Sequence, residues 1–433
     1  MSRIVVVGSQ WGDEGKGKVI DILSQEADWI VRAQGGNNAG HTIIFGSQEY
    51  KLHLIPTGIL QPHTHCAIAA GTVIDPEVLV NEMKTLAERG ISFDNRFWIS
   101  PNAHVIMPYH KIMDALQEKR KRNVAIGTTK RGIGPCYCDK VNRIGIRMGD
   151  LIDPKHFKQA LSSVLKLKNE ELVKLYHADP LSFQEIYDEY LALGKKLLSH
   201  IRDINPLLTQ AAENRETVIF EGAQGTFLDV TSGTYPYVTS SNTTTSGICS
   251  GAEIGPTSVD HVLGVMKVYA TRVGNGPFPT ELSHHPHFNP TDAREVGTTT
   301  GRDRRIGWFD AVLARASVTI NGISSLAMTK LDILDPFEEI QICVSYKLHG
   351  KTYHTPPPEI RYWDDIEPEY ETLPGWQCST TNIRDIQKLP TNAQRYLERI
   401  SELSGAPISF ISLGPEREQT LIVNSPIKQT MGV

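Results

Sequence analysis

The fold of this chain is decided by the stretch Ile4-Val5-Val6-Val7-Gly8-Ser9-Gln10-Trp11-Gly12-Asp13-Glu14-Gly15-Lys16-Gly17-Lys18-Val19. Its first four residues form an apolar run that is typical of a buried parallel strand. A loop rich in glycine follows, and a helical pattern begins after it. Glycine lets a backbone approach oxygen atoms closely, and the first N–H groups of a helix point at an anion. The stretch therefore predicts a phosphate-binding strand, turn and helix.

The glycine-rich loop fits most of a P-loop motif but departs from it in two ways. Gly12 to Lys18 have the spacing G-x-x-x-x-G-K, in which Lys18 would reach a phosphate. Val19 stands where a P-loop has Ser or Thr to hold magnesium. Asp13 and Glu14 lie inside the loop, and a carboxylate beside phosphates must bind a metal or take part in proton transfer. An ordinary glycine-rich turn without a ligand is the alternative interpretation.

Composition limits the classes of protein that this chain can belong to. It has 433 residues, a net charge of −5 and 21% charged residues, which argues against a protein that coats nucleic acid. Six cysteines are scattered without a C-x-x-C pair, so neither a zinc site nor a disulfide framework is expected. The chain starts directly in a strand, and no apolar run approaches the ~18 residues of a membrane span. We expect a cytoplasmic enzyme or binding protein without a membrane or nucleic-acid partner.

Two further glycine-rich loops follow predicted strands. A strand is expected at 29–33, and it ends in a loop of small and amide residues, 34–42, before a strand resumes. Another buried strand, 218–220, leads into Glu221-Gly222-Ala223-Gln224-Gly225. Ligands in open α/β sheets collect at the carboxyl ends of strands, so both loops are expected to approach a ligand. His41 in the first loop is also compatible with a buried structural role.

The rest of the chain alternates apolar strands with helical stretches. Residues 155–213 are strongly helical, and we interpret the apolar stripe from Phe183 to Ile201 as core packing rather than a binding surface. Residues 231–251 are rich in Thr, Ser and Gly without a period, which favours an ordered polar loop. Further elements are expected as strands at 66–70, 264–270, 324–328 and 408–413 and as a helix at 393–403.

Two polar loops carry clusters of basic residues. Residues 127–135 combine hydroxyls, basic side chains and glycines, which suits a phosphate or a subunit contact. Residues 297–305 place hydroxyls beside Arg302, Arg304 and Arg305. Guanidinium groups pair bidentately with carboxylates and phosphates, so this second cluster predicts an anionic ligand. A solvated surface cluster is the alternative.

A tetrad near residue 330 points to guanine. Thr329-Lys330-Leu331-Asp332 has the pattern [NT]-K-x-D, with which many GTP-binding proteins read the base. The carboxylate accepts from the ring N1–H and the exocyclic amine, a donor pair that adenine lacks. The late strand at 408–413 and the turn after it could close over such a base.

These motifs together resemble the adenylosuccinate synthetase family, and the resemblance covers essentially the whole chain. Two segments are highly specific to that family, namely Gln10-Trp11-Gly12-Asp13-Glu14-Gly15-Lys16-Gly17-Lys18 and Gly35-Gly36-Asn37-Asn38-Ala39-Gly40-His41-Thr42. Arg302 with Arg304, residues 329–332 and residues 412–414 agree with it in order and spacing.

The resemblance implies a GTP-dependent ligase. In the family, GTP phosphorylates the 6-oxygen of IMP, and L-aspartate then displaces the phosphate, giving adenylosuccinate, GDP and phosphate in the first committed step from IMP to AMP. Asp13 is implied as the base for N1–H and, with the Gly40 carbonyl, as a ligand of one Mg²⁺ per subunit. His41 is implied as a donor to the transferring phosphoryl group, and Lys16 and Lys18 as counter-charges. The implied catalytic residues are Asp13, Lys16, His41 and Gln224.

The implied substrate contacts fall into three groups. Those for IMP are Asp13, Glu14, Gly15, Lys16, Asn38, Ala39, Gly40, His41, Thr129, Arg143, Gln224, Thr239 and Arg302. Those for L-aspartate are Thr298, Thr299, Thr300, Gly301, Arg302, Asp303 and Arg304. Those for GTP are Gly12, Asp13, Glu14, Gly15, Lys16, Gly17, Lys18, Gly40, His41, Thr42, Arg304, Lys330, Leu331, Asp332, Ser412, Leu413 and Gly414. Asp303 departs from the family, where Arg or Pro is common, and this bears on the charge balance of the aspartate loop.

The resemblance also implies the fold and the assembly. We expect one α/β domain over residues 1–433, with a large, mainly parallel central sheet flanked by helices and a P-loop-like GTP site. Residues 155–213 would form a helical insertion and residues 338–400 a smaller peripheral segment with short strands. A homodimer is implied, in which Arg143 reaches into the active site of the second subunit.

Two other classes of function fit part of the sequence. A regulatory GTP switch would share residues 329–332, but it would carry Ser or Thr in place of Val19 and a D-x-x-G motif, which this chain lacks. A dinucleotide-dependent oxidoreductase would use the first loop, but Gly8 and Gly12 do not give G-x-G-x-x-G, and NAD has no use for lysines there.

Overall fold

The core of the molecule is a nine-stranded sheet with β1 in its middle. The computed structural model describes residues 2–45, 48–121, 126–283, 288 and 304–429. The strand order is β19-β18-β14-β10-β1-β9-β2-β5-β7, and each pairing in this sheet is parallel except that of β18 with β19. The strands are β1 Ser2–Gly8, β2 Trp29–Arg32, β5 His65–Ile68, β7 Phe97–Ile99, β9 Thr217–Glu221, β10 His261–Lys267, β14 Ser325–Thr329, β18 Ile408–Ser412 and β19 Thr420–Ile422.

Both faces of β1 are buried because its side chains alternate between two apolar clusters. Val5 and Val7 belong to one cluster, whereas Ile4 and Val6 belong to the other. The strand pairs in register with β9, so that Val6 lies opposite Glu221. The apolar run therefore forms a central parallel strand, as predicted, and the glycine-rich loop emerges at its carboxyl end.

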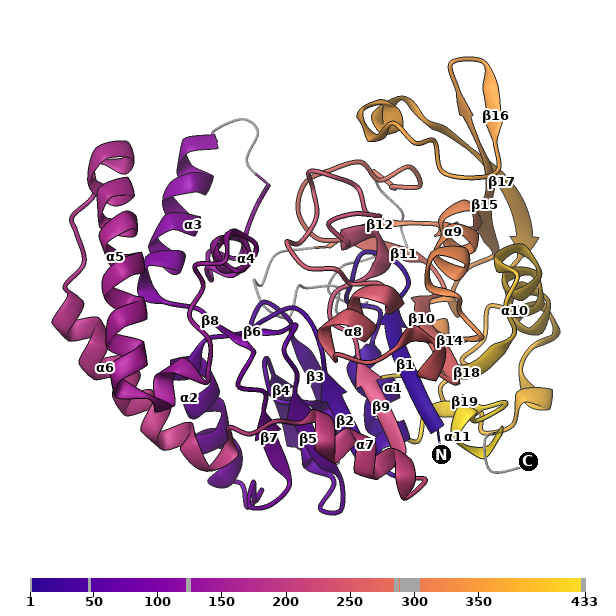
Figure 1. The fold of residues 1–433 in the computed structure, drawn as a ribbon. Coiled ribbons are helices and arrows are strands. Elements are labelled where there is room, and N and C mark those ends of the chain that lie inside the picture. Colours follow the sequence, from indigo (N-terminus) through magenta and orange to yellow (C-terminus); the bar gives the residue numbers. More distant parts are fainter. Residues whose placement is uncertain (1, 46–47, 122–125, 284–287, 289–303, 430–433) are drawn as a thin grey trace.

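Helices cover both faces of the sheet (Figure 1). α1, α2, α5 and α6 supply side chains to the cluster that contains Ile4 and Val6, and α7, α8, α9 and α10 supply the other. This two-sided cover confirms the predicted α/β class with a large, mainly parallel sheet. The helices are α1 Lys16–Ser24, α2 Pro76–Ala87, α3 Pro108–Lys121, α4 Ile133–Asn142, α5 Pro154–Tyr176, α6 Phe183–Leu197, α7 Asn205–Glu213, α8 Thr245–Gly251, α9 Ala311–Asn321, α10 Thr391–Ser404 and α11 Pro426–Gln429.

Short strands form smaller sheets around the core. One sheet at the upper right of Figure 1 joins β13, β15, β16 and β17, and its largest pairing is the antiparallel one of β15 with β17. The hairpin of β3 and β4 begins at His41, and two further pairs are β6 with β8 and β11 with β12. Their bounds are β3 His41–Phe45, β4 Gln48–Leu52, β6 Val73–Ile74, β8 His104–Val105, β11 Ala270–Arg272, β12 Arg305–Gly307, β13 Phe309–Asp310, β15 Glu339–Leu348, β16 Lys351–Tyr353 and β17 Glu367–Pro374.

Two segments differ from the sequence-based expectation. The apolar run 264–270 does not form one strand, because β10 ends at Lys267 and β11 begins at Ala270 in another sheet. The Gln10 side chain bridges this break by accepting the Lys267 N–H at 3.0 Å and donating to the Tyr269 carbonyl at 2.9 Å. The end of the expected polar loop 231–251 forms helix α8, which its Thr-, Ser- and Gly-rich sequence conceals.

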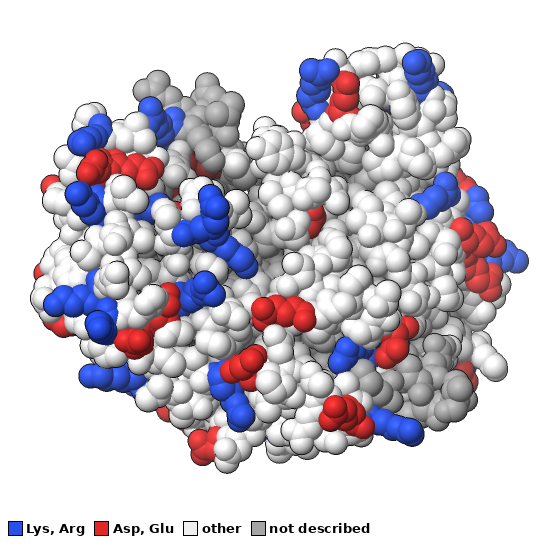
Figure 2. All heavy atoms as spheres, viewed as in Figure 1, with Lys and Arg blue, Asp and Glu red and all other residues white. Residues whose placement is uncertain are grey.

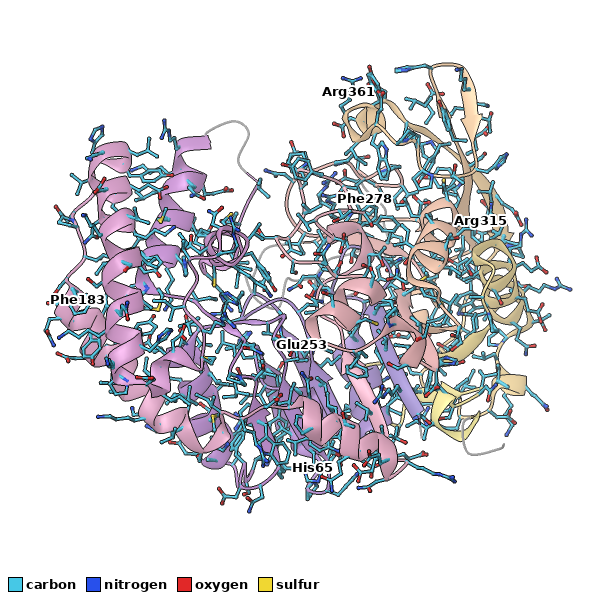
Figure 3. The ribbon with its side chains drawn as sticks, in the orientation of Figure 1. His65, Phe183, Glu253, Phe278, Arg315 and Arg361 are labelled. Carbon is cyan, nitrogen blue, oxygen red and sulfur yellow. The ribbon has the colours of Figure 1, made fainter. Side chains whose placement is uncertain are left out.

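The apolar stripe of α6 packs into the core as expected, with one exception. Ile186, Tyr190 and Leu197 are buried, but Leu198 is 53% exposed because α6 ends at Leu197 and the chain continues as a 3-10 turn. Figure 3 shows Phe183 on the outer helical layer and Phe278 among the loops of the upper centre.

The described part of the molecule has no charged patch that dominates the view in Figure 2. Lys and Arg side chains alternate there with Asp and Glu side chains over the same elements. None of the described helices combines the length and the apolar character that a membrane crossing needs.

Candidate active site

The turn after β1 is shaped by residues with positive φ and by a buried carboxylate. Gly12, Asp13 and Gly15 have φ values of 83°, 59° and 92°. Glu14 is fully buried, and its Oε1 accepts the N–H groups of Gln10 at 3.0 Å and Gly12 at 2.9 Å. Helix α1 begins directly behind, with Gly15 as its N-cap. This turn presents the N-terminus of a helix to an anion, with the loop held open by Glu14.

Lys16 is held at the base of this turn by two oxygen atoms. Its Nζ lies 2.6 Å from Glu14 Oε2 and also donates to the backbone carbonyl of Gln224. Only glycine fits at position 8, since a Cβ there would lie 2.4 Å from the backbone carbonyl oxygen of Gln224 and 2.5 Å from Glu14 Oε2. The Lys16 ammonium thus ties the first loop to the end of β9.

Arg304 reaches the same turn from the segment before β12. Its Nε and Nη2 lie 3.0 and 2.9 Å from Asp13 Oδ2. Arg304 is 8% exposed, whereas Asp13 is 27% exposed and remains open to a ligand. The rest of the predicted aspartate loop lies outside the described residues, namely Thr298, Thr299, Thr300, Gly301, Arg302 and Asp303.

His41 lies between the first turn of α1 and the end of β9. Its Nδ1 contacts Oε1 of Glu221, and the hydroxyl of Thr57 lies 3.5 Å from the same nitrogen. A Cβ at Gly17 would lie 3.1 Å from His41 Cβ, so the histidine packs directly on the helix start. Burial alone would raise the pKa of Glu221, but His41 and neighbouring donors hold that pKa below its usual range.

The Gln224 side chain is aimed into the space beside the 34–38 loop. Its Oε1 and Nε2 are both buried without a hydrogen-bond partner among the described residues. A Cβ at Gly35 would lie 3.0 Å from that Oε1. Gln34 connects this region to the next loop, because it donates to Ala223 O at 2.6 Å and accepts from Ser241 at 3.2 Å. A buried amide group without a hydrogen-bond partner is costly. The Gln224 amide is therefore suited to pair with the polar edge of a ligand's ring.

The loop that carries Thr129 is held against the 34–38 loop. Arg131 donates to the Asn37 carbonyl, and Glu118 of α3 accepts the N–H groups of Gly127 and Thr128. Thr129 itself is half-buried between these anchors. Arg131, two residues after Thr129, thus connects this loop to the backbone of the 34–38 loop.

The remaining predicted contacts for IMP are spread over three elements. Asn38 accepts the Gly36 N–H at 3.2 Å, and Thr239 is half-buried and donates its N–H to Leu228 at 2.9 Å. Arg143 is the C-cap residue of α4, with a φ of 63°, and is exposed. Ala39 and Gly40 come directly before β3, and Thr42, a predicted GTP contact, is its second residue.

A third group of predicted residues meets Lys18 at the far end of the turn. Lys18 Nζ donates to Ser412 Oγ at 2.8 Å, to the Gly414 carbonyl at 2.7 Å and to the Gln419 carbonyl at 3.2 Å. Burial lowers the pKa of Lys18 to about 7, although the nearby charge of Asp332 opposes this shift. The predicted base-reading loop thus contacts the helix that begins at the phosphate turn.

The predicted guanine carboxylate is half-buried, and one of its oxygen atoms is buried without a partner among the described residues. Asp332 Oδ1 has no hydrogen bond within the described ranges, and burial raises the pKa of this carboxyl, while Lys330 opposes the shift. Thr329 anchors the segment, because its hydroxyl donates to Glu14 O at 2.6 Å. Lys330 has a φ of 65°, and Leu331, which follows it, is fully buried.

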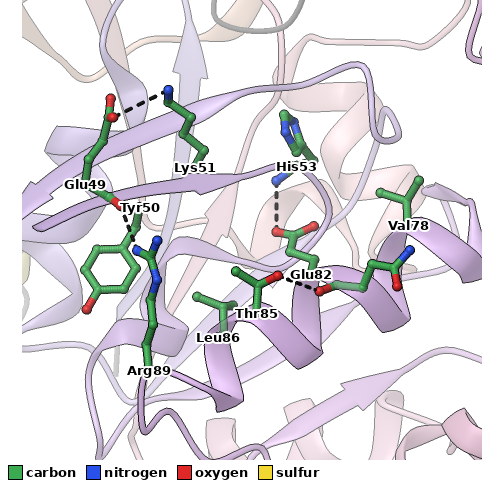
Figure 4. Close-up of a pocket in the computed structure, with 10 residues that line it drawn as sticks. Glu49, Tyr50, Lys51, His53, Val78, Glu82, Thr85, Leu86 and Arg89 are labelled. Carbon is green, nitrogen blue, oxygen red and sulfur yellow. Dashed lines mark hydrogen bonds and ion pairs between the residues drawn. The ribbon is translucent and has the colours of Figure 1, made fainter.

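A separate groove of about 470 Å³ lies between the β3–β4 hairpin and α2 (Figure 4). Its lining includes Lys51, His53, Glu82 and Arg89. Glu82 points from α2 to the backbone, where it accepts the N–H groups of His53 at 2.9 Å and Leu54 at 3.0 Å. None of the residues predicted to bind a substrate lines this groove.

Sequence reasoning missed two residues that shape the site. Glu221 was visible only as a carboxylate at a strand end, and nothing in the sequence links it to His41. Arg272 is 1% exposed and lies over the Trp11 ring at 5.3 Å from the centroid. It also donates to the Tyr237 carbonyl at 3.1 Å, near Thr239. Such long-range pairs have no local sequence signal.

Comparisons with known proteins cover nearly the whole chain. The family model described as adenylosuccinate synthetase matches residues 5–421. A protein named adenylosuccinate synthetase from a Synechococcus strain is 52% identical over 429 residues, which are 99% of this chain and 95% of that protein. Another of the same name from Heliobacterium modesticaldum is 51% identical over 422 residues, which are 97% of this chain and 99% of that protein.

A solved structure agrees with this result. The structure described as fully ligated adenylosuccinate synthetase from Plasmodium falciparum has a TM-score of 0.91 and 37% identity, and the match covers 97% of this chain and 99% of that chain. The sequence resemblance to this family is thereby confirmed over the chain's length. The chain belongs to the adenylosuccinate synthetase family, and it is a ligase that uses GTP to join L-aspartate to IMP, giving adenylosuccinate.

Proposed function

We propose that this ligase carries out both of its chemical steps at the turn after β1, with Asp13, Lys16, His41 and Gln224 as its catalytic residues. In the first step the 6-oxygen of IMP takes the γ-phosphoryl group of GTP, and GDP leaves. In the second step the amine of L-aspartate attacks C6 of 6-phosphoryl-IMP, and phosphate leaves. The gathering of these four residues around the start of α1 carries the proposal.

Asp13 is the proposed base of the first step. The 6-oxygen of IMP is a poor nucleophile until N1–H is removed, and a carboxylate within reach of N1 can accept that proton. Asp13 is suited to this role because it lies in the phosphate turn and is partly open. The proposed partner at the purine is Gln224, whose two unpaired amide atoms fit the ring's polar edge.

Two oxygen groups near the turn also fit one Mg²⁺ ion per subunit. Mg²⁺ prefers oxygen ligands and takes few of them from protein when phosphates and water supply the rest. The Asp13 carboxylate and the Gly40 carbonyl offer this chemistry. When bound, the ion would neutralise the charge of the nucleotide phosphates and of the group in transfer.

Stabilisation of the transferring phosphoryl group falls to His41 and the lysines. His41 packs against the first turn of α1. Its ring can therefore donate to oxygen atoms whose negative charge grows in the transition state. Lys16, held beside that helix start, supplies a fixed positive charge. For nucleotide choice, we propose that Asp332 accepts from guanine and that Ser412, Leu413 and Gly414 cover the base.

The proposal extends to the other substrates and to the assembly. Asn38, Thr129, Thr239 and Arg302 would bind IMP, and residues 298–304 would bind L-aspartate through their hydroxyls and arginines. The chain would act as one domain, with 155–213 as a helical insertion and 338–400 as a peripheral segment. It would form a homodimer in the cytoplasm, with Arg143 reaching the partner's IMP site.

The proposed catalytic centre is tested by phosphate release from purified protein with Mg²⁺ and GTP. Wild type should release phosphate only when IMP and L-aspartate are both present, with the ultraviolet change of a 6-oxo purine becoming a 6-amino purine, and ATP should not replace GTP. Asp13→Asn should lower kcat by at least about 100-fold, which is typical of a lost general base. An Asp13→Asn enzyme with the kcat of wild type would exclude Asp13 as the base.

A further inference from the structure

Glu221 ends β9 with a fully buried carboxylate that faces His41. Its Oε1 contacts His41 Nδ1 and accepts the Thr57 hydroxyl at 3.0 Å, and its Oε2 accepts the Thr57 N–H at 2.8 Å. The Glu221 side chain is 0% exposed and that of His41 is 8% exposed. One carboxylate therefore joins the end of β9, the start of β3 and the turn that begins at Thr57.

The positions of the hydrogen atoms in this cluster follow from the donors. Burial alone would raise the pKa of Glu221, but His41, Arg32 and the Thr57 N–H together lower it, so the carboxyl is ionised at neutral pH. An ionised carboxylate only accepts hydrogen bonds. Both Thr57 groups donate to it, so the contact with His41 requires a proton on Nδ1. The second ring nitrogen, Nε2, is then left for a ligand.

The ring is fixed from a second side by α1. A Cβ at Gly17 would lie 3.1 Å from His41 Cβ, so the imidazole is confined between this helix start and Glu221. A carboxylate behind a histidine selects one tautomer and stabilises the imidazolium ion when it forms. With a proton on Nδ1, the ring donates from Nε2 to a phosphoryl oxygen only as the doubly protonated imidazolium ion, which the Glu221 carboxylate stabilises.

We propose that Glu221 is a positioning residue for phosphoryl transfer, which keeps a proton on His41 Nδ1 and thereby directs Nε2 at the transferring group. This inference rests on the proposed role of His41. The charged and titratable groups that face the pair are Arg32 of β2, which lies close to Glu221, and His53, which follows β4 and lies close to His41. Lys16 lies on the helix turn next to Gly17.

Glu221→Gln tests the proposal, because it keeps the shape and removes the charge. We expect kcat to fall by about 10- to 100-fold, while KM for IMP and GTP stays within about threefold, since the loss falls on the transition state. A kcat equal to that of wild type would overturn the proposal.

Glu82→Gln is the matched control. Glu82 is also a buried carboxylate, and it accepts backbone N–H groups from residues 53–55, next to the Thr57 turn, as Figure 4 shows for His53. It does not contact His41, so the kcat and the KM values of Glu82→Gln should match those of wild type. An equal change in both variants would indicate a structural effect of lost buried charge and would overturn the positioning role.

Nitrogen-15 NMR of histidine-labelled wild type keeps the test independent of variants that fail to fold. The His41 signals, identified by their loss in His41→Asn, should show a protonated Nδ1 at pH 8, and a bare Nδ1 would overturn the proposal.

Failure of the proposed role of His41 can be distinguished from failure of the proposed role of Glu221. If His41→Asn keeps full kcat, the catalytic role of His41 is wrong, whereas a large loss in His41→Asn with none in Glu221→Gln refutes only the role of Glu221. In a His41→Asn background, Glu221→Gln should have no further effect on kcat.

Discussion

Three cationic side chains surround the turn after β1, and their charges are balanced differently. Lys16 pairs with Glu14, and Arg304 pairs with Asp13. Buried ion pairs are tolerated only when further hydrogen bonds complete them, as the two N–H groups that Glu14 accepts do here. Lys18 instead donates to a hydroxyl and two carbonyls, all uncharged. Its burial lowers its pKa to about 7, so it titrates near neutral pH in the nucleotide-free protein.

We expect GTP binding at pH 8 to take up close to one proton through Lys18. The folded pKa of about 7 leaves this group mostly neutral at pH 8, and nearby phosphates favour its charged form. The affinity for GTP should therefore fall as pH rises above 7, because binding then requires a proton. Calorimetry in buffers of different ionisation enthalpy measures this uptake, which should vanish in Lys18→Met.

Lys174→Met serves as the control for that measurement, since Lys174 is 75% exposed on α5 and pairs, within the described part of the chain, only with Glu170 of the same helix. It should take up the same proton as wild type. Equal uptake by wild type and Lys18→Met would show that Lys18 keeps its protonation state on binding. The lysine would then act only as the link between α1 and the loop that starts at Ser412.

At the scale of elements, helix α8 packs closely against the segments that follow β2 and β5, and this packing fixes the start of the 34–38 loop. A Cβ at Gly251 would lie 1.9 Å from the Ala33 carbonyl, and Gly71 donates its N–H to Gly251 at 2.9 Å. Gly251→Ala should lower the free energy of unfolding by about 3 kcal/mol, the cost of overpacking a rigid backbone contact. It should also raise KM for IMP, because Ala33 leads into the loop with Asn38. Urea denaturation and initial rates measure the two effects.

Gly255→Ala is the matched control for this contact. Gly255 has a φ of −69°, and a Cβ there meets nothing within 4 Å. The unfolding free energy of Gly255→Ala should stay within about 1 kcal/mol of wild type and should rise rather than fall, because alanine restricts the unfolded chain. If the two variants lose equal stability, the close approach at Gly251 is not what limits that position.

The sequence predicted these elements where burial leaves a local pattern. The parallel strands β2, β9 and β14 are buried throughout, and β1 is buried except at Arg3; each was visible as an apolar run. α8 was not visible, because its glycines serve close packing rather than helix propensity. The break after Lys267 also escaped, since the Gln10 side chain that bridges it lies 257 residues away.

The candidate site, like the fold, was predictable where the signal is local. Motifs at the ends of strands predicted which loops meet at α1, because a phosphate site needs glycines and a helix start within one stretch of chain. The partners of those side chains were not predictable. Glu221 is the last residue of β9 and meets His41 of β3, and Asp13 meets Arg304 across 291 positions. Such pairs depend on strand order, which no single segment encodes.

At the scale of the whole molecule, the site is assembled from segments that lie far apart in the chain, and one predicted member faces outward. Arg143 ends α4 and is exposed, and Val141, two residues earlier, is 77% exposed. Tyr235, in the loop before Thr239, is 64% exposed. Large exposed apolar side chains beside a predicted substrate contact favour a subunit interface at this end of α4.

We expect Val141→Asp to weaken the proposed homodimer and to lower activity in a concentration-dependent way. A charge placed in an apolar interface costs binding free energy, so the variant should dissociate at concentrations where wild type stays dimeric. Sedimentation velocity and specific activity, measured over the same dilution series, should fall together, because each IMP site would lose the partner's arginine. Val173→Asp, at a residue 44% exposed on α5, is the control and should follow wild type. A monomeric Val141→Asp protein with full kcat would show that each subunit completes its own site and would refute the shared arginine.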